Sequence, residues 1–170
     1  MNYTLKEFLR LLKNKKPICF INNEKIINFS KANEYNGIEE LHYIPNIGGT
    51  KDKDVTQFNT YFIYLDCGRD KNGNYFDLDT VSKYKKKKLK ELQKFQPSPS
   101  AIIQTRNGLQ GYWFIRDVPT PSQWKRIENY LVKKFDADVN VKNPAKQLRL
   151  SCTVWMKEGY TSSLCIIPMQ

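Results

Sequence analysis

Short hydrophobic runs bounded by Asn, Gly and Pro recur along the chain and predict β-strands. The most strongly patterned run covers residues 59–66 (NTYFIYLD), which are rich in aromatic and β-branched side chains and end at a carboxylate. Residues 101–105 and 109–115 flank Arg106-Asn107-Gly108, a sequence typical of a tight turn between paired strands. Weaker runs predict further strands over 18–21, 42–44, 148–154 and 163–167.

Three segments carry hydrophobic residues at helical spacing. The first begins with a capping-box pattern at Thr4 and is expected to stop before Pro17. The second covers about 80–95, with Asp79 as the expected N-cap. The third covers 123–135 and is amphipathic through Trp124, Ile127, Tyr130, Leu131 and Phe135.

The order of these elements predicts the fold class. Helices and strands are mixed without strict βαβ alternation, which favours an α+β fold with a mainly antiparallel sheet flanked by helices. The chain has 170 residues, no internal repeat and no long linker, so residues 1–170 are expected to form a single domain.

Charge indicates the kind of partner. The chain has 28 Lys and Arg against 17 Asp and Glu, a formal net charge of +11. Such an excess points to nucleic acid first and to an acidic membrane surface second. No apolar stretch approaches the ~18 residues that would cross a bilayer, and no signal-peptide core is present, so we expect a cytoplasmic protein without a membrane role.

Several kinds of chemistry are excluded. The single histidine, His42, rules out mechanisms that need a His pair, and the four cysteines lack the CxxC spacing of a zinc ribbon or a redox dithiol. The phosphate-binding motif GxxxxGK[ST] is absent, so the sequence encodes no ATPase motor.

Acidic residues at strand ends are candidate metal ligands. Asp66 closes the strongest strand, and in an extended chain Asp70 would share its face. Asp138 follows the third helix and could complete a carboxylate cluster for Mg²⁺ or Mn²⁺. The structural alternative is that these acids end a strand or form turns. The rival pair, Asp77 and Asp79, precedes a helix and is interpreted as capping.

Basic and amide side chains supply candidate anion-binding groups. Arg106 and Asn107 could donate to phosphate oxygens, and Gln110 could point from the following strand toward the same cleft. Lys146 and Arg149 could neutralise a triphosphate. The alternative is a hairpin whose aromatic residues are core, and both interpretations can hold on alternate faces.

The second helix is rich in lysine. Seven lysines lie between 83 and 94, and Lys83, Lys86, Lys87 and Lys90 are the candidate nucleic-acid contacts. They could follow a DNA or RNA backbone without sequence preference. A solvated helix face is the structural alternative.

Taken in order, these segments resemble the archaeo-eukaryotic primase superfamily, especially the RepB-type primase domains of plasmids and phages. The resemblance covers about residues 41–160. Its segments are 45–49 (PNIGG), 64–70 (YLDCGRD), 105–113 (TRNGLQGYW), 137–138 (AD), 148–150 (LRL) and 155–157 (WMK). Each segment is short, and it is their order and spacing that carries the resemblance.

The resemblance implies a core related to the RNA-recognition fold, and a primase or primase-polymerase that extends nucleotide chains on single-stranded DNA. Mg²⁺ or Mn²⁺ would be held by Asp66, Asp70 and Asp138, with Asp70 replacing the usual second acid because position 68 is glycine. Gln110 takes the place often held by histidine. Arg106, Asn107, Lys146 and Arg149 would contact the incoming NTP or dNTP.

The resemblance also implies two macromolecular partners. The template would be single-stranded DNA, and unwinding would need a helicase encoded separately or on a longer chain. The alternative is a primase-like fold with a degraded metal site that binds single strands or origins. Gly68 favours it, as does the aromatic strand 111–115, whose rings could stack on bases.

Overall fold

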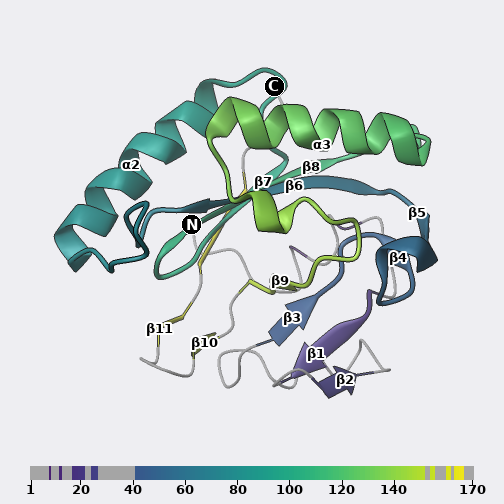
Figure 1. Cartoon of the computed structure of the whole chain (residues 1–170), viewed down its shortest axis with the longest axis horizontal. Helices are drawn as coiled ribbons and strands as arrows, with labels where there is room; N and C mark the ends of the chain where they lie inside the picture. The colour runs from purple at the N-terminus through teal and green to yellow at the C-terminus, as the bar shows by residue number, and fades with distance from the viewer. Residues whose placement is uncertain are drawn as a thin grey trace.

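The structure is a computed structural model that describes residues 8, 12, 17–21, 24–26, 41–151, 154–155, 160–161 and 163–166. Its centre is a four-stranded antiparallel sheet in the order β12-β7-β8-β6 (Figure 1). The strands are β6 (Thr60–Asp66), β7 (Ala101–Gln104), β8 (Gly108–Phe114) and β12 (Ser163–Ile166). This sheet confirms the predicted α+β class.

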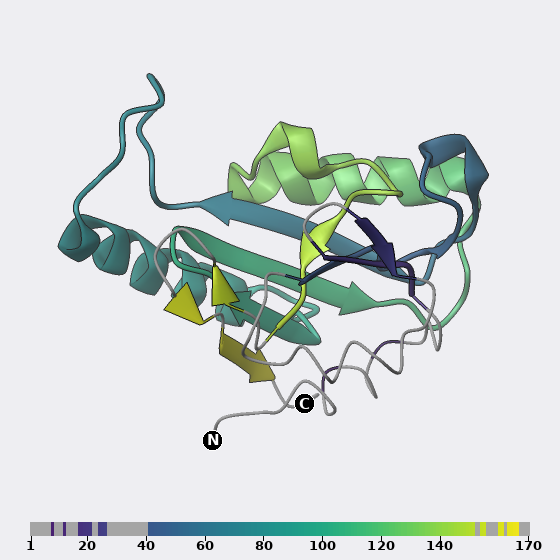
Figure 2. The same cartoon turned by 90° about the horizontal axis from the view of Figure 1, so that it is seen from below.

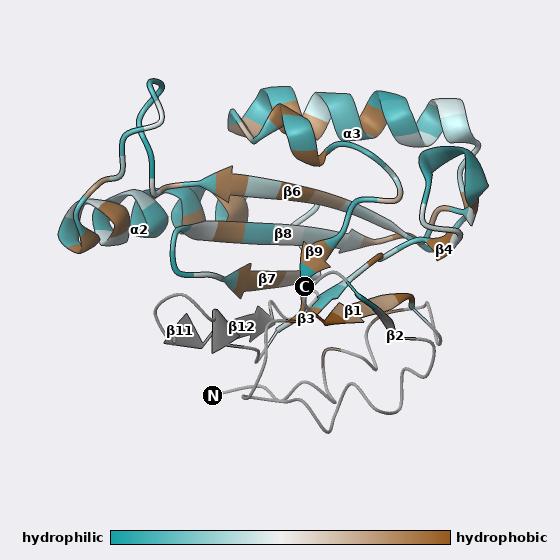
Figure 3. Ribbon diagram, turned by 60° about the horizontal axis from the view of Figure 1, so that its bottom comes forward, coloured by the Kyte–Doolittle hydropathy of each residue, from teal (hydrophilic) through white to brown (hydrophobic). Residues whose placement is uncertain are grey.

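Two helices cover one face of the central sheet (Figure 1). They are α2 (Leu78–Lys94) and α3 (Pro121–Phe135), whose outer turns are mostly hydrophilic (Figure 3). Alternate residues of β6 and β8 point toward them, among them Ile63, Leu65 and Trp113, and join Leu92 and Leu131 in one buried cluster. Burial of this apolar surface holds the helices on the sheet.

A second four-stranded sheet lies against the other face. Its order is β2-β1-β3-β9, formed by β1 (Cys19–Ile21), β2 (Glu24–Ile26), β3 (Leu41–Tyr43) and β9 (Leu148–Arg149). Phe62 and Tyr112 of the central sheet share a buried cluster with Tyr43 of this second sheet. The core therefore lies on both sides of the central sheet.

The remaining elements are short. Two hairpins are formed by β4 (Ile47–Gly48) with β5 (Val55–Gln57) and by β10 (Val154–Trp155) with β11 (Tyr160–Thr161). Single-turn 3-10 helices are η2 (Asp52–Asp54) and η3 (Val139–Val141). Residues 67–77 connect β6 to α2 as a loop that projects from the body of the molecule (Figure 2).

Several sequence-based expectations need correction. Helix α2 is capped by Asp77, which accepts from Thr80 N, and not by Asp79. The predicted strand over 148–154 is two separate strands, β9 and β10. In α3 the residue that is buried among the apolar ones is Glu128, whereas Ile127 and Tyr130 are exposed.

The predicted first helix falls largely outside the described residues. Of that segment, Phe8 and Leu12 are both buried, and Leu12 N donates to the Phe8 carbonyl at 3.2 Å. Thr4 and the other residues of the expected helix are not described.

The exposed edge of the central sheet, strand β6, is closed by contacts from α3 and from the segment that follows it. Along β6, Trp124 Nε1 donates to the Thr60 carbonyl (2.9 Å), and Phe62 N donates to Glu128 Oε2 (3.3 Å). Two residues further on, Asp138 N donates to the Tyr64 carbonyl at 2.9 Å. An unpaired strand edge needs such partners, and here the third of them brings Asp138 beside the end of β6.

Candidate nucleotide-binding site

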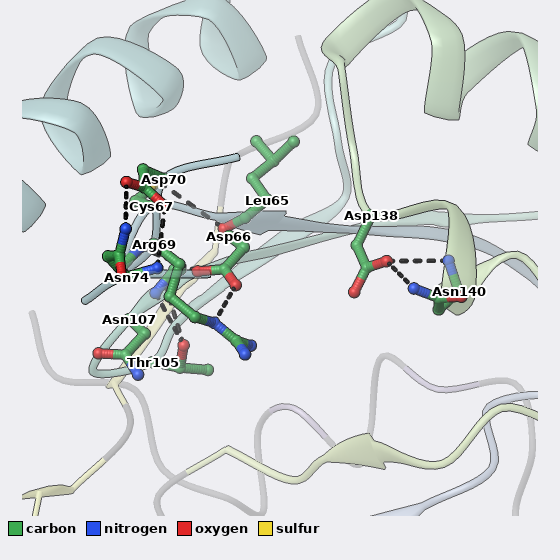
Figure 4. Close-up of polar contacts among 12 residues, drawn as sticks. Leu65, Asp66, Cys67, Arg69, Asp70, Asn74, Thr105, Asn107, Asp138 and Asn140 are labelled. Carbon is green, nitrogen blue, oxygen red and sulfur yellow. Dashed lines mark hydrogen bonds and ion pairs between the residues drawn. The ribbon is translucent and has the colours of Figure 1, made fainter. Parts of the chain in front are cut away.

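Asp66 ends strand β6 and leaves the sheet with both carboxylate oxygens engaged. Oδ1 accepts from Gly68 N at 2.9 Å, and Oδ2 accepts from Arg69 Nε at 3.0 Å (Figure 4). The Asp66 side chain is 24% exposed and that of Arg69 is 48% exposed. The neighbouring Asp66 carboxylate raises the pKa of Arg69, so this guanidinium stays charged.

Asp138 lies on the same side of the molecule as Asp66. Its Oδ1 accepts from Asn140 N (2.9 Å) and Asn140 Nδ2 (3.0 Å), which caps η3. Tyr64 and Asp66 are two residues apart in a strand and share a face, so the Asp138–Tyr64 backbone bond brings the two acids to one edge. Figure 4 shows the Asp66 carboxylate beside Arg69 and the Asp138 carboxylate beside Asn140.

Asp70 does not join the other two acids. It accepts from Asn72 N, Asn74 N and Asn74 Nδ2 within its own loop, at 2.8 to 3.0 Å, and the Asn74 contacts lower the pKa of Asp70. The two-residue period fails here because the chain turns directly after Asp66. Among the described residues, which include all three predicted acids, no group of three His, Cys, Asp or Glu side chains could hold a metal ion.

The structure also explains why position 68 is glycine. A Cβ atom there would lie 2.7 Å from Cβ of Asn107 and 2.9 Å from its Cγ. Cys67 N donates to the Asn107 carbonyl at 2.7 Å, which fixes this close approach. The β7–β8 turn therefore fills the space where a second acid would begin.

A cavity of about 330 Å³ lies beside these residues, between the two sheets. Six of the predicted site residues line it: Arg106, Asn107, Gln110, Asp138, Lys146 and Arg149. Arg69 adds a fourth cation, so four basic side chains face one carboxylate, and the cavity favours an anion. Its volume lies within the range of small-molecule sites.

Several residues that line the cavity were not predicted from the sequence, among them Arg69, His42, Tyr64 and Tyr75. His42 on β3 stands directly opposite Arg149 on β9, and both line the cavity. Tyr64 and Tyr75 also line the cavity, and burial followed by the Asp66 charge raises the pKa of Tyr64 to about 12. A signal existed for Tyr64, which lies two residues before Asp66. For His42 there was none, because its pairing with Arg149 joins distant segments.

Gln110 is a buried link between the sheets. Its amide nitrogen donates to Tyr112 Oη (2.7 Å) and to the Arg149 carbonyl (3.1 Å), while its oxygen accepts from Arg149 N (3.3 Å). Gln110 is only 4% exposed. It thus fixes the backbone of Arg149 at the wall of the cavity.

The lysines of α2 divide into two groups. Lys85 Nζ donates to the Thr105 carbonyl at 2.7 Å and Lys88 Nζ to the Phe135 carbonyl at 2.8 Å, so these two hold the helix in place. The four predicted nucleic-acid contacts, Lys83, Lys86, Lys87 and Lys90, are all exposed. By contrast, Tyr112 and Trp113 are buried and do not form the predicted base-stacking surface.

The acidic side chains at this edge are candidate ligands of a divalent cation. Mg²⁺ and Mn²⁺ prefer oxygen ligands, and the carboxylates of Asp66 and Asp138 supply them. Asp138 Oδ2 accepts no hydrogen bond from the described residues, and Asp66 Oδ2 would exchange its contact with Arg69 for the ion. The oxygens of Asp70, by contrast, accept from backbone and side-chain groups of its own loop. The Arg69 guanidinium already contacts Asp66 Oδ2, so it would compete with a metal ion for this oxygen.

Comparison with solved structures identifies the class of fold. The chain is similar to the AEP domain of the primase-polymerase of cyanophage S-2L, with a TM-score of 0.70 and 15% identity over 98% of this chain and 90% of that one. It is also similar to the catalytic domain of primase RepB′, solved with initiator DNA, at a TM-score of 0.63 and 9% identity over 94% and 81%.

A further structure of RepB′ gives a TM-score of 0.54 at 11% identity; this chain covers 55% of it, while 96% of this chain is aligned. No family model and no curated protein sequence matches the chain. The chain has the archaeo-eukaryotic primase fold, so the predicted resemblance is confirmed at the level of the fold. No helix of the described residues is long and apolar enough to cross a membrane.

Proposed function

We propose that this chain is a primase or primase-polymerase domain of a mobile element, which joins nucleotides on a single-stranded DNA template. The observation that carries the proposal is the bond from Asp138 N to the Tyr64 carbonyl, 2.9 Å long. This bond ties Asp138, which lines a cavity with four cations, to the strand that ends at Asp66. The fold shared with primase domains supports the same conclusion.

In the proposed reaction, the 3′-oxygen of one nucleotide attacks the α-phosphate of the next. The bond from this oxygen to phosphorus forms as the bond to the leaving pyrophosphate breaks. Mg²⁺ or Mn²⁺ held by Asp66 and Asp138 would supply positive charge against the charge that develops on the phosphate. Asp70 is not a metal ligand in this proposal, since its oxygens accept hydrogen bonds from Asn72 and Asn74.

The cavity's own residues bind and orient the nucleotide. Arg106, Lys146 and Arg149 neutralise the phosphates, and Asn107 offers an amide at the same wall. Gln110 acts as a positioning residue because it holds the backbone of Arg149. The protein side of the reaction is therefore mainly placement and charge compensation.

The template would lie along basic surface outside the cavity. The exposed lysines of α2 (Lys83, Lys86, Lys87 and Lys90) offer a surface for the phosphate backbone of single-stranded DNA. A helicase, encoded separately or on a longer chain, would open the duplex. Both NTP and dNTP remain candidate substrates of this proposal.

The test is incorporation of labelled nucleotides on a single-stranded template with Mn²⁺ or Mg²⁺. We expect the wild type to extend, and Asp66→Asn and Asp138→Asn to lose about 10²-fold or more, since metal stabilisation is worth several kcal/mol. Asp70→Asn is the matched control and should retain most activity. Equal loss in all three variants, or none, would remove this assignment of ligands.

A binding module is the second candidate. The absence of a three-acid group among the described residues favours it, as does the contact that excludes a side chain at position 68. A chain of this kind would bind single-stranded DNA equally well with and without metal. It would incorporate no nucleotide under any condition, so one assay separates the two candidates.

A further inference from the structure

A second cavity adjoins the proposed nucleotide site. Its volume is about 540 Å³, and it shares His42, Lys146 and Gln147 with the first cavity. Beyond these common residues it extends to Lys51 and Asp52 on one side and to Asn143 on the other. The two cavities therefore meet along a common wall, and the proposed function uses only one of them.

The sequence segment 45–49 (PNIGG), which the proposed reaction leaves without a role, builds this second cavity. Asn46 is buried; its Oδ1 accepts from Asn59 N (2.9 Å) and Thr60 N (3.2 Å), and its Nδ2 donates to the Pro144 carbonyl (3.0 Å). One side chain thus joins the start of β6 to the segment that forms the far wall.

The glycines of this segment close the near wall. Gly48 has a φ of +137°, and a Cβ there would lie 2.2 Å from the Asp54 carbonyl oxygen, so only glycine fits. Gly49 N donates to the same carbonyl at 2.9 Å. The resulting tight β4–β5 hairpin presents residues 50–52 to the cavity.

The two walls are also bonded directly to each other. Ala145 N donates to Asp52 Oδ1 at 3.1 Å, so the one carboxylate of this cavity is partly committed to the backbone. The remaining ionisable side chains at the cavity are His42, Lys51 and Lys146. The cavity is thus held open by hydrogen bonds and lined by cation-forming groups, a combination suited to an anion.

We propose that this second cavity is a phosphate-binding site that extends the nucleotide site. Apart from His42, no aromatic side chain of the described residues lines it, so it offers phosphate contacts and no stacking surface. The ligand is a phosphate of a nucleoside triphosphate or of the polynucleotide backbone. This inference rests on the proposed function for the role of the adjoining cavity.

The experiment compares Lys51→Glu with Lys53→Glu. Both lysines are exposed and lie two residues apart, but only Lys51 lines the cavity. A fluorescent nucleoside triphosphate and a labelled short single-stranded oligodeoxynucleotide are titrated separately, by anisotropy, in EDTA and at several salt concentrations. Circular dichroism confirms that both variants fold.

Lys51→Glu is expected to weaken the binding of at least one probe about tenfold. It should also lower the dependence of that affinity on salt concentration, its log–log slope, by about one. Lys53→Glu should change either affinity less than about threefold. Loss confined to the triphosphate assigns the site to a nucleotide, and loss with the oligodeoxynucleotide assigns it to the backbone; both support the proposal. No binding by the wild type, no effect of Lys51→Glu, or equal effects of the two variants would overturn it.

The two proposals fail separately in these measurements. Metal is absent, so binding does not depend on catalysis. A chain that shows the Lys51 dependence but incorporates no nucleotide would keep the phosphate site and lose the primase function. A chain that incorporates nucleotides without any Lys51 dependence would do the reverse.

Discussion

The two faces of strand β6 have opposite roles although their residues alternate along one segment. Ile63 and Leu65 are buried among the side chains of α2, α3 and β8. Tyr64 and Asp66, one position further on in each case, face the cavity side, where Tyr64 lines the cavity and Asp66 bonds Arg69. Residues that stabilise the core therefore alternate along β6 with residues that face the charged cavity.

Helix α2 shows the same separation over its own surface. The ammonium groups of Lys85 and Lys88 donate hydrogen bonds to backbone carbonyls of the β7–β8 turn and of α3. The lysines next to them, Lys86 and Lys87, are exposed. Composition alone does not distinguish these lysines, whereas the structure divides them into a group bonded to backbone carbonyls and an exposed group.

Leu65→Ala tests the buried face of β6 and should have the largest effect on the free energy of unfolding. Leu65 is 1% exposed, and truncation of a buried leucine costs about 2–5 kcal/mol. Urea denaturation should show this loss, while Asp66→Asn should leave the free energy of unfolding nearly unchanged. A larger loss in Asp66→Asn than in Leu65→Ala would contradict the division of the two faces.

Gly68→Asp tests whether the cavity side can accept the missing acid. Its Cβ would meet Asn107, and overpacking of this kind costs about 1–3 kcal/mol. Gly68→Asp combined with Asn107→Gly should regain most of the lost stability, as measured by thermal unfolding. If the double variant is no more stable than the single one, the Asn107 contact is not the reason for glycine.

Glu128→Gln tests the one buried acid of the described residues. Burial raises the pKa of Glu128 well above its usual 4.5, so the folded chain keeps a proton that the unfolded chain releases. The stabilisation is full below pH 4.5 and is lost as the pH rises through the folded-state pKa. The free energy of unfolding of the wild type should therefore decline with rising pH more steeply than that of Glu128→Gln.

The matched control for this experiment is Glu91→Gln. Glu91 on α2 forms an ion pair with Lys88 at 3.2 Å and is 39% exposed. Its substitution should leave the pH dependence close to that of the wild type. If the free energy of unfolding changes equally with pH in Glu128→Gln and Glu91→Gln, Glu128 is not the cause of the pH dependence.

Lys86→Glu with Lys90→Glu should have the smallest effect on the fold and a measurable effect on binding. These residues lie one helical turn apart on the exposed face. Affinity for single-stranded DNA should drop, with a salt slope lower by about two, while stability is unchanged. Lys88→Ala should lower stability and leave the affinity for single-stranded DNA unchanged. If Lys88→Ala lowers the affinity, or the double variant lowers stability, the division of the lysines into two groups is wrong.

Much of the central sheet could be predicted because its signals are local. The strand that ends at Asp66, the turn at Asn107 and both helices follow from alternation, turn residues and helical periodicity. Glu24–Ile26 was missed because a three-residue strand with two charged residues carries no hydrophobic pattern. Its pairing with β1 comes from the tertiary structure.

The site was predicted in part for the same reason. Arg106, Asn107 and Asp138 were found through short motifs, and the structure brings them to one cavity. Asp70 was placed by the two-residue period of an extended chain, which ends where Asp66 accepts from Gly68 N. The roles of His42 and Asn46 depend on contacts between distant segments, which no local pattern encodes.

The most direct test of the central claim is a crystal structure of the chain with Mn²⁺ and a non-hydrolysable nucleoside triphosphate. The account predicts an anomalous manganese peak at the carboxylates of Asp66 and Asp138, with the phosphates against Arg106 and Arg149. A peak at Asp70, or a nucleotide bound outside this cavity, would contradict it.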